Sequence, residues 1–420
     1  MRRLLTAAAA ILIGATVAPA PAQAARPYVK VGYFTQWGIY GRDFQLAKVD
    51  KSGAAARLTH LNYAFGPVTA AGVCDSADPW ADWQTPFPAA LSVDGVADVE
   101  GQPLAGNLNQ LAELKAKHPG LRVLISLGGW TGSAYFSDAA RTDASRKKLV
   151  TSCVDLWLKG NLPGLPAGTA AGIFDGIDLD WEWPGSDGNA GNIVRPEDKH
   201  NFTLLAAEFR NQLDAYGRKS RKHFDLTAFL PAAPAKIDAG FEVKQVFQSL
   251  DFGTVQGYDF HGSWESRTNQ QSAIRVPAGA PDNPDFSIEV AIGAYRSRGA
   301  PASKLVLGIP YYGQGWTGAA GLFAPATGGA PGTFAVGTED YKVLKNLPAQ
   351  GFTIHRDWRA GHSYLTDGTT FWTYDDPAQI LQKTAWIRTH HLGGAMMWSL
   401  DGDDSSATLT RTISAGLATR

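Results

Sequence analysis

Eight short apolar runs recur along the chain, and longer segments of helical spacing separate them. Runs of this length that alternate with helices are typical of βα units, in which crossover helices join parallel strands. Eight such units predict a closed (β/α)8 TIM barrel. The expected strands are residues 29–34, 58–65, 122–127, 172–181, 224–230, 254–258, 305–311 and 394–398.

Three of the connecting segments carry an apolar face at helical spacing, namely residues 107–117, 197–216 and 377–389. A TIM barrel usually needs about 250 residues, so a chain of 420 residues predicts insertions. We expect the barrel to comprise residues 25–312 and 373–420. Residues 313–372 are expected to form a small α+β insertion between the seventh and eighth strands, at the rim where the strands end.

The first 24 residues are typical of a secretory signal peptide. Arg2 and Arg3 precede an apolar run, which ends in the small-residue pattern Ala22-Gln23-Ala24. We therefore predict an exported, extracellular protein. No later stretch of about 20 apolar residues predicts a membrane span.

The charges nearly balance, with 38 Lys and Arg against 39 Asp and Glu. A chain without a net field has no general attraction for nucleic acid or an anionic membrane, so we expect a neutral partner. We also expect a monomer. Cys74 and Cys153 are the two cysteines, and their spacing leaves open whether they form a disulfide. No histidine pair accompanies them, so no metal site is expected. We also expect no cofactor.

The segment FDGIDLDWEWPG, residues 174–185, places carboxylates in a run that otherwise predicts a buried strand. Side chains alternate along a strand, so Asp178, Asp180 and Glu182 share one face. Helices cover the outside of a parallel barrel, which predicts that the acidic row points inward with Glu182 nearest the mouth. Asp175 is out of phase with the row, and we interpret it as a structural hydrogen-bonding group.

Carboxylates spaced about 7 Å apart on one buried face cannot all ionise comfortably, so at least one should hold a proton near neutral pH. A protonated carboxyl beside an ionised one is what glycoside cleavage requires. This reasoning makes Glu182 the candidate acid and Asp180 its partner. The spacing also allows a mechanism in which Asp180 is the nucleophile, and a buried acidic network without catalysis is the simpler alternative.

The segment Asp175-Gly-Ile-Asp-Leu-Asp-Trp-Glu182 resembles the DGxDxDxE signature of glycoside hydrolase family 18 chitinases. Residues 126–130, SLGGW, resemble the SxGG motif of that family, and Tyr258-Asp259 resembles the end of its MxYD motif, with Gln256 in place of Met. Residues 308–313 and 394–399 resemble its seventh and eighth strands. The resemblance covers about residues 28–409.

This resemblance implies a secreted chitinase that hydrolyses β-1,4 bonds between N-acetylglucosamine units with retention, the substrate's own acetamido oxygen acting as nucleophile. Glu182 would be the general acid and base, and Asp180 would orient the acetamido group while sharing a proton with Asp178. Tyr258 would donate its hydroxyl to the acetamido oxygen. The candidates for binding chitin or N-acetylglucosamine oligosaccharides are Asp259, Trp398, Gln256, Trp130, Tyr33, Trp37, Trp264 and Trp316.

Two departures from the family pattern bear on substrate preference and pH optimum. Gln256 replaces a methionine near the reacting sugar, and Gln314 stands where many relatives have arginine. An endo-β-N-acetylglucosaminidase acting on glycan cores is an alternative that would share the acidic row. A non-catalytic chitin-binding lectin is another, although the usual mark of such lectins is loss of the proton donor and Glu182 is present. His261 is interpreted as a hydrogen-bonded neighbour of the site rather than a base.

Overall fold

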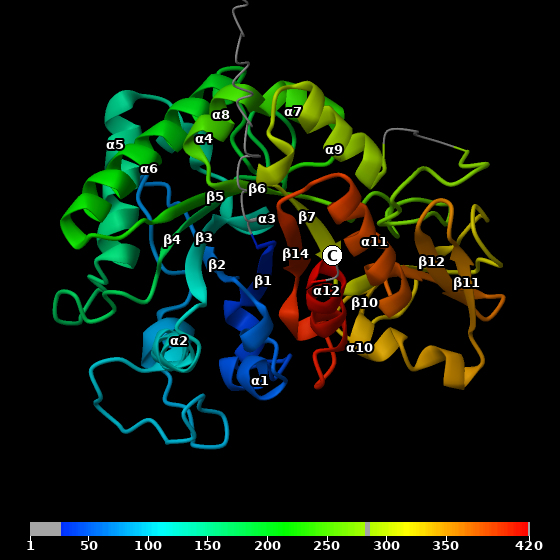
Figure 1. Ribbon diagram of the computed structural model, residues 1–420, viewed down its shortest axis with the longest axis horizontal. Coiled ribbons are helices and arrows are strands. Elements are labelled where there is room, and N and C mark those ends of the chain that lie inside the picture. The colour runs from blue at the N-terminus through cyan, green and yellow to red at the C-terminus, as the bar shows by residue number, and fades with distance from the viewer. Residues whose placement is uncertain (1–26, 282–285, 419–420) are drawn as a thin grey trace, which may run out of the picture.

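The computed structural model describes residues 27–281 and 286–418. The predicted signal peptide, residues 1–24, lies outside the described residues. Eight parallel strands close into a barrel in the order β1-β14-β7-β6-β5-β4-β3-β2 (Figure 1). The strands are β1 Val29–Thr35, β2 His60–Gly66, β3 Arg122–Gly128, β4 Gly176–Asp180, β5 Asp225–Leu230, β6 Phe252–Val255, β7 Leu305–Pro310 and β14 Gly394–Trp398. The predicted (β/α)8 barrel is confirmed.

Two of the predicted strands have different limits in the structure. The fourth was predicted from residue 172, but Gly172 has a φ of +86° and β4 begins only at Gly176. The sixth was predicted to extend to Tyr258, but β6 ends at Val255. Tyr258 therefore lies beyond the strand, in the loop at the barrel mouth.

Helices cover the outside of the barrel (Figure 1). The three predicted helices are α2 Gly106–Lys117, α6 Asp198–Ser220 and α11 Pro377–Thr389. α11 begins where Asp376 accepts hydrogen bonds from the main-chain N–H groups of residues 378 and 379 and proline occupies the first helical position. The others are α1 Leu46–Lys51, α3 Gly129–Gly132, α4 Phe136–Ala140, α5 Asp143–Cys153, α7 Pro234–Gly240, α8 Val243–Ser249, α9 Ile288–Ser297 and α12 Thr408–Ala418.

The alternation along β4 orients its side chains as predicted. Ile177, Leu179 and Trp181 are fully buried in the apolar layer between strands and helices. The Trp181 ring lies 5.3 Å from that of Phe136 on α4 and 6.1 Å from that of Phe202 on α6. This apolar packing fixes the outer face of β4, so the acidic row must face the barrel interior.

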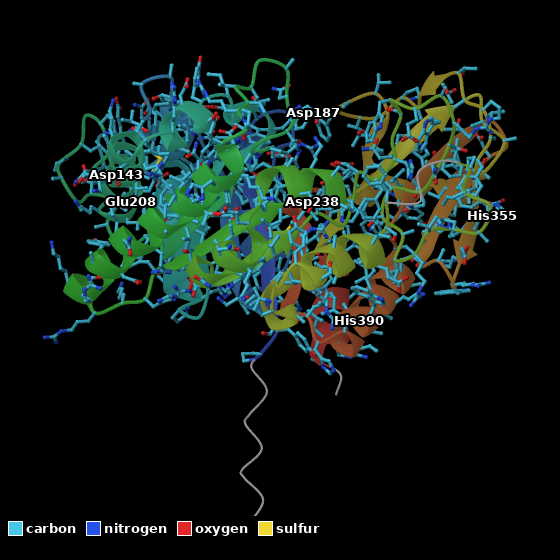
Figure 2. The ribbon with its side chains drawn as sticks, turned by 90° about the horizontal axis from the view of Figure 1, so that it is seen from above. Asp143, Asp187, Glu208, Asp238, His355 and His390 are labelled. Carbon is cyan, nitrogen blue, oxygen red and sulfur yellow. A yellow bond between two sulfur atoms is a disulfide. The ribbon has the colours of Figure 1, made fainter. Side chains whose placement is uncertain are left out.

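The chain segment between β7 and α11 forms an antiparallel sheet, which lies beside the barrel in both views (Figures 1 and 2). Its order is β10-β8-β13-β12-β11, with β9 paired to β8. The outer strand β11 carries His355, which Figure 2 shows at the opposite side of the molecule from Asp143 and Glu208. The elements are β8 Tyr312–Thr317, β9 Gly328–Gly329, β10 Thr338–Asp340, α10 Tyr341–Leu344, β11 Thr353–Asp357, β12 His362–Thr366 and β13 Thr370–Tyr374.

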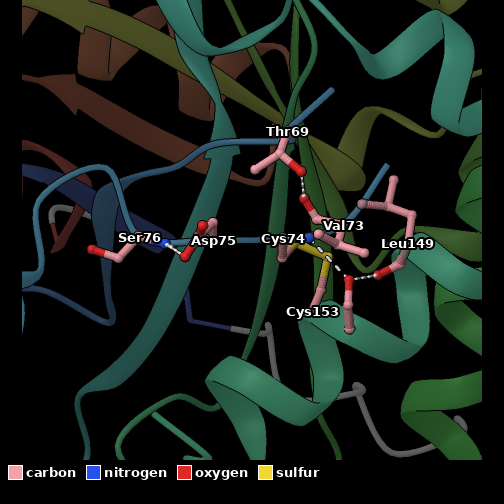
Figure 3. The surroundings of a disulfide bond; sticks show 8 residues. Thr69, Val73, Cys74, Asp75, Ser76, Leu149 and Cys153 are labelled. Atoms are coloured by element: carbon pink, nitrogen blue, oxygen red, sulfur yellow. Dashed lines mark hydrogen bonds between the residues drawn. A yellow bond between two sulfur atoms is a disulfide. The ribbon is translucent and has the colours of Figure 1, made fainter. Parts of the chain in front are cut away.

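Cys74 and Cys153 form a disulfide, which answers the question that their spacing left open (Figure 3). Their Cα atoms are 5.0 Å apart, and the bond joins the segment after β2 to the end of α5. The main-chain N–H of Cys74 also donates to the Ser152 hydroxyl at 2.9 Å. In the part of the chain that the structure describes, no helix has both the length and the apolar content of a membrane span.

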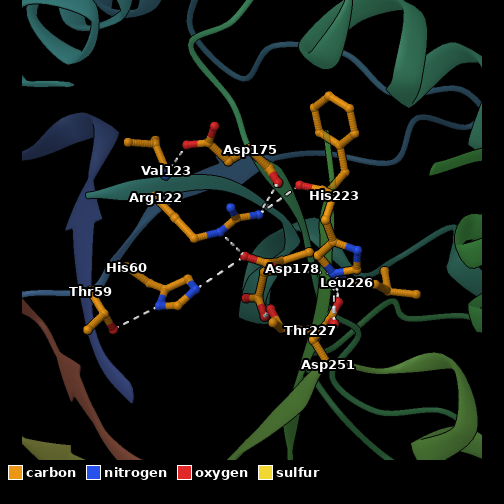
Figure 4. Close-up of polar contacts among 12 residues, drawn as sticks. Thr59, His60, Arg122, Val123, Asp175, Asp178, His223, Leu226, Thr227 and Asp251 are labelled. Carbon is orange, nitrogen blue, oxygen red and sulfur yellow. Dashed lines mark hydrogen bonds and ion pairs between the residues drawn. The ribbon is translucent and has the colours of Figure 1, made fainter. Parts of the chain in front are cut away.

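Polar side chains gather where the strands begin, at the opposite end from the mouth (Figure 4). Asp175 accepts a hydrogen bond from the main-chain N–H of Val123 at 2.9 Å and pairs with Lys115 at 2.6 Å. Asp225 is bonded by Arg122 and by His60, the latter at 3.2 Å. Asp175 thus ties the start of β4 to β3, as predicted from its phase.

Candidate active site

Asp178 lies at the bottom of the acidic row and is completely buried. Three hydroxyl groups from other strands donate to its carboxylate, from Tyr33 on β1 at 2.6 Å, Ser126 on β3 at 2.7 Å and Thr227 on β5 at 2.5 Å. Burial raises the pKa of Asp178, and the hydrogen bonds partly oppose that rise. These donors from around the barrel hold Asp178 in one orientation.

Asp180 is the next acid along β4 and is 3% exposed. Burial raises its pKa well above the ordinary range, and the negative charges of Glu182 and Asp178 raise it further. Its Oδ1 atom has no hydrogen-bond partner among the described residues. Gly128 on β3 lies against the main chain of Asp180, since a Cβ there would come within 2.3 Å of its carbonyl oxygen. The site thus contains a buried carboxyl group with unused hydrogen-bonding capacity.

Glu182 follows β4 and is partly exposed. Its main chain is fixed on both sides, since its N–H donates to the Ser133 hydroxyl at 3.0 Å and its carbonyl accepts from Asn192 at 2.8 Å. Burial raises the pKa of Glu182 to about 8, and the charge of Asp259 adds to the rise, whereas Lys236 and a hydrogen bond with Asp180 oppose it. A carboxyl with this pKa holds a proton near neutral pH while remaining within reach of solvent.

The loop after β6 faces this row. Tyr258 is 5% exposed, and burial together with the charges of Asp259, Asp180 and Glu182 raises the pKa of its hydroxyl far above the ordinary range. Asp259 has a φ of +56° and accepts a hydrogen bond from Gln314 of β8 at 2.8 Å. Tyr258 and Asp259 thus lie close enough to Asp180 and Glu182 for their charges to act on one another.

Aromatic rings surround the mouth. The Trp398 ring, at the end of β14, stacks on Phe65 with centroids 5.8 Å apart and meets the Tyr33 ring edge-on at 5.2 Å. Trp37 lies 6.0 Å from Phe65. Trp37, Trp130 and Trp264 are 43%, 50% and 63% exposed, which leaves flat faces available to a ligand.

Comparison with known proteins gives a match over residues 29–403 to the model of "Glycosyl hydrolases family 18". The chain belongs to this family. Chitinase C of Streptomyces lividans is 40% identical over 90% of this chain and 58% of its own length. The chain spans about three-fifths of the length of the first curated chitinases that it matches, from Streptomyces and Niallia.

Two solved structures illustrate the family likeness. The catalytic domain of psychrophilic chitinase B from Arthrobacter TAD20 superposes with a TM-score of 0.90, is 47% identical, and covers 93% of this chain and 95% of that one. A mutant of the Ostrinia furnacalis Group II chitinase catalytic domain 2, in complex with a penta-N-acetylchitooctaose ligand, has a TM-score of 0.75 and 27% identity. It covers 92% of this chain and 95% of that chain.

The structure corrects two expectations about this family 18 site. Trp316 was expected as an exposed ring on the rim, but it is completely buried in the insertion against Phe371, because β8 turns its side chain into that sheet. Tyr33 was a candidate for substrate binding, but it is 1% exposed and its hydroxyl is bound to Asp178. Ser126, the first residue of the segment that resembles the SxGG motif, donates to the same carboxylate.

The remaining candidates lie around the same mouth with differing access. Gln256 is partly exposed just beyond β6, and its main-chain N–H donates to Leu230 at 2.9 Å. His261 is 4% exposed and its Nδ1 lies 3.0 Å from the Glu265 carboxylate, consistent with a neighbour of the site rather than a free base. Gln314, noted as a departure from the family, bonds the Asp259 carboxylate.

Sequence reasoning missed several residues that complete the site. Thr227 contacts Asp178, Tyr312 contacts Asp259, and Phe65 joins Trp37 to Trp398. Thr227 and Phe65 belong to none of the motifs noted in the sequence, whereas Tyr312 lies in the segment 308–313 that resembles the seventh strand of the family. Thr227 lies on β5 directly opposite Asp178, and that position becomes a useful signal only when strand register is known.

One group of side chains among residues 27–281 and 286–418 has the spacing of metal ligands, namely His223, Asp225 and Asp251 at the start of β5 and β6 (Figure 4). Both carboxylates already have cationic partners, since Asp225 pairs with Arg122 and Asp251 with Arg210. The arginine side chains therefore already supply positive charge to these oxygens.

Proposed function

We propose that this protein is a chitinase that hydrolyses β-1,4 bonds between N-acetylglucosamine units with retention of configuration. The observation that carries the proposal is Glu182, a carboxyl of raised pKa at the barrel mouth, directly above the buried Asp180 and Asp178. Family membership supports the reaction class. The exposed rings of Trp37, Trp130 and Trp264 support a neutral sugar polymer as substrate.

In the proposed first step, Glu182 gives its proton to the glycosidic oxygen while the acetamido carbonyl oxygen of the same substrate sugar attacks the anomeric carbon. The bond between that carbon and the glycosidic oxygen breaks, which releases the leaving sugar and forms an oxazolinium ion. Water then attacks the anomeric carbon, the bond between that carbon and the acetamido oxygen breaks, and the Glu182 carboxylate removes a proton from that water. Both steps invert the carbon, so the configuration is retained.

Asp180 is assigned to orient the acetamido group rather than attack carbon. Its burial beneath Glu182 and its unpartnered oxygen favour a role as acceptor for the acetamido N–H. Asp178 is held by three hydroxyl donors and would share a negative charge with Asp180. That charge would stabilise the oxazolinium ion as it forms. Tyr258 would donate to the acetamido oxygen and Trp398 would form the floor beneath the reacting ring.

The test compares wild type with Glu182→Gln on colloidal chitin, chitotetraose and a high-mannose glycopeptide. The amide preserves shape but cannot donate an acidic proton, so we expect turnover to fall by at least about 100-fold while oligosaccharide binding persists. Asp180→Asn should also be severely impaired. Glu265→Gln changes a carboxylate that pairs with His261 and is the matched control.

Turnover of the glycopeptide alone would replace the chitinase proposal with the glycan-core alternative. Binding without turnover by wild type would favour a lectin. NMR of the first product gives the stereochemistry, and an initial β-anomer is expected. Undiminished hydrolysis by Glu182→Gln would reject the assigned acid.

We also propose that residues 1–24 direct export and that the mature protein is an extracellular monomer. The N-terminal sequence of protein recovered from culture medium should begin at Ala25, and its mass in solution should be that of one chain. Retention of residues 1–24 in the extracellular protein would contradict the signal-peptide assignment.

A further inference from the structure

Asp82 is a completely buried carboxylate outside the acidic row, on the segment between β2 and α2. It lies in the short helix Trp80–Gln84 and accepts hydrogen bonds from the side chains of Gln36, Tyr63 and Ser76. All three donors are neutral. A buried carboxylate is costly unless its oxygens are satisfied, so each donor contributes to keeping Asp82 in place.

The three donors come from three different segments. Gln36 begins η1 Gln36–Ile39, the turn after β1; Tyr63 is on β2; and Ser76 is in the loop that leads to Asp82. Asn107 of α2 extends the network, because its amide donates to the Tyr63 hydroxyl at 3.0 Å and to the Gln36 carbonyl at 3.3 Å. Asp82 is therefore the point at which the β1–α1 and β2–α2 loops are joined.

These two loops carry exposed aromatic rings. Trp37 directly follows Gln36 and is 43% exposed, and its ring contacts Phe65, which stacks on Trp398. Tyr40, in the same loop, is 48% exposed and donates its hydroxyl across to Asp78 at 2.6 Å. Trp80, two residues before Asp82, is 51% exposed. A shift of either loop would move rings on both.

We propose that Asp82 is a positioning residue that fixes the loops carrying Trp37, Tyr40 and Trp80 relative to the barrel mouth, and thereby sets affinity for long polysaccharide chains. The inference rests on the proposed function and concerns binding beyond the reacting sugar rather than bond cleavage. Burial raises the pKa of Asp82 to about 6, so at pH 7.5 the carboxylate is ionised and can accept all three hydrogen bonds.

The experiment compares Asp82→Ala, Asp82→Asn and Asp98→Ala at pH 7.5 on chitohexaose and on a short fluorogenic chitobioside. Alanine removes the acceptor for all three donors. Asparagine can keep its carbonyl toward Gln36 and Tyr63 and its amide toward Ser76, so it should restore the loops. Asp98 is the matched control, because it lies in the same β2–α2 segment and accepts from three partners without bonding η1.

We expect Asp82→Ala to raise KM for chitohexaose at least about fivefold while kcat for the chitobioside stays within about twofold, with Asp82→Asn close to wild type. Asp98→Ala should leave both constants nearly unchanged. A comparable loss on both substrates, or no rescue by asparagine, would overturn the proposal. If Asp82→Ala does not fold, Tyr63→Phe removes one donor, keeps the ring, and should change KM in the same direction.

A measurement independent of turnover separates this inference from the proposed function. Amide hydrogen exchange of residues 36–40 and 76–84 should accelerate together in Asp82→Ala and stay slow in Asp98→Ala. Exchange that rises in only one segment would contradict the joining of the two loops. Wild type that leaves chitin intact would refute the chitinase proposal, whereas the exchange result would still decide whether Asp82 couples the loops.

Discussion

Replacing Lys236 by methionine should move the basic limit of activity to higher pH. Lys236 lies on α7, with its ammonium 6.0 Å from the centre of the Trp183 ring and bonded to the Asp187 carbonyl at 2.6 Å. Its charge opposes the rise in the pKa of Glu182, whereas Asp259 adds to it. In the proposed mechanism Glu182 must be protonated to act as the acid, so activity should fall as pH passes its pKa of about 8. Removing the cation favours the protonated form and therefore raises that pKa.

The size of this effect follows from screening near the surface. The Lys236 side chain is 28% exposed and is also paired with Asp187 at 3.3 Å. Charge pairs near the surface interact by about 0.2–1 kcal/mol, which corresponds to a change of about 0.1–0.7 in pKa. Asp259→Asn removes a negative charge and should move the limit in the opposite direction.

The assay is kcat/KM for a fluorogenic chitobioside between pH 5 and pH 10, fitted for the basic limb. Lys199→Met is the matched control, since Lys199 also bonds a main-chain carbonyl, that of Asp238 at 2.7 Å, and does not contribute to the pKa of Glu182. A limb that moves downward in Lys236→Met, or no further than in Lys199→Met, would refute the assignment of Glu182 as the titrating acid.

Three further predictions concern Asp178, the insertion and the disulfide. Tyr33→Phe removes one hydrogen-bond donor from buried Asp178, so it should lower the free energy of unfolding by about 1.5–3 kcal/mol and also reduce kcat. Tyr311, whose hydroxyl contacts Thr410, is the control, and Tyr311→Phe should lower stability without changing kcat. Urea titrations and kinetics on the same samples measure both effects. Burial lowers the pKa of His362 to about 4, below its value in the unfolded chain. Between about pH 6.5 and pH 4 the unfolded state therefore binds the extra proton, and the free energy of unfolding should fall by about 3 kcal/mol over this range. A His362→Leu variant that shows the same decline would contradict this prediction. Replacing both disulfide cysteines by serine should lower the free energy of unfolding by about 2–5 kcal/mol, because the bond closes a long loop, with a sequence separation of 79. An unchanged melting temperature would argue against this contribution.

The sequence alone determined the barrel and the direction of the acidic row. The apolar residues at every second position of β4 pack against the helices outside the barrel, so Asp178, Asp180 and Glu182 must face its interior. This inference uses only the fixed alternation of a strand, a local property. Two strand limits differ from the prediction, because Gly172 has a positive φ and the strand β6 ends at Val255, before Gly257.

Only the tertiary structure decided which side chains reach each carboxylate. Tyr33 and Asp178 are 145 positions apart in the chain, and closure of the barrel with its particular register brings the hydroxyl to the acid. The same holds for the burial of Trp316, which depends on how β8 pairs with β13, and for Asp82, whose donors come from separate loops. Such contacts depend on register and loop placement between distant segments, which local alternation does not specify.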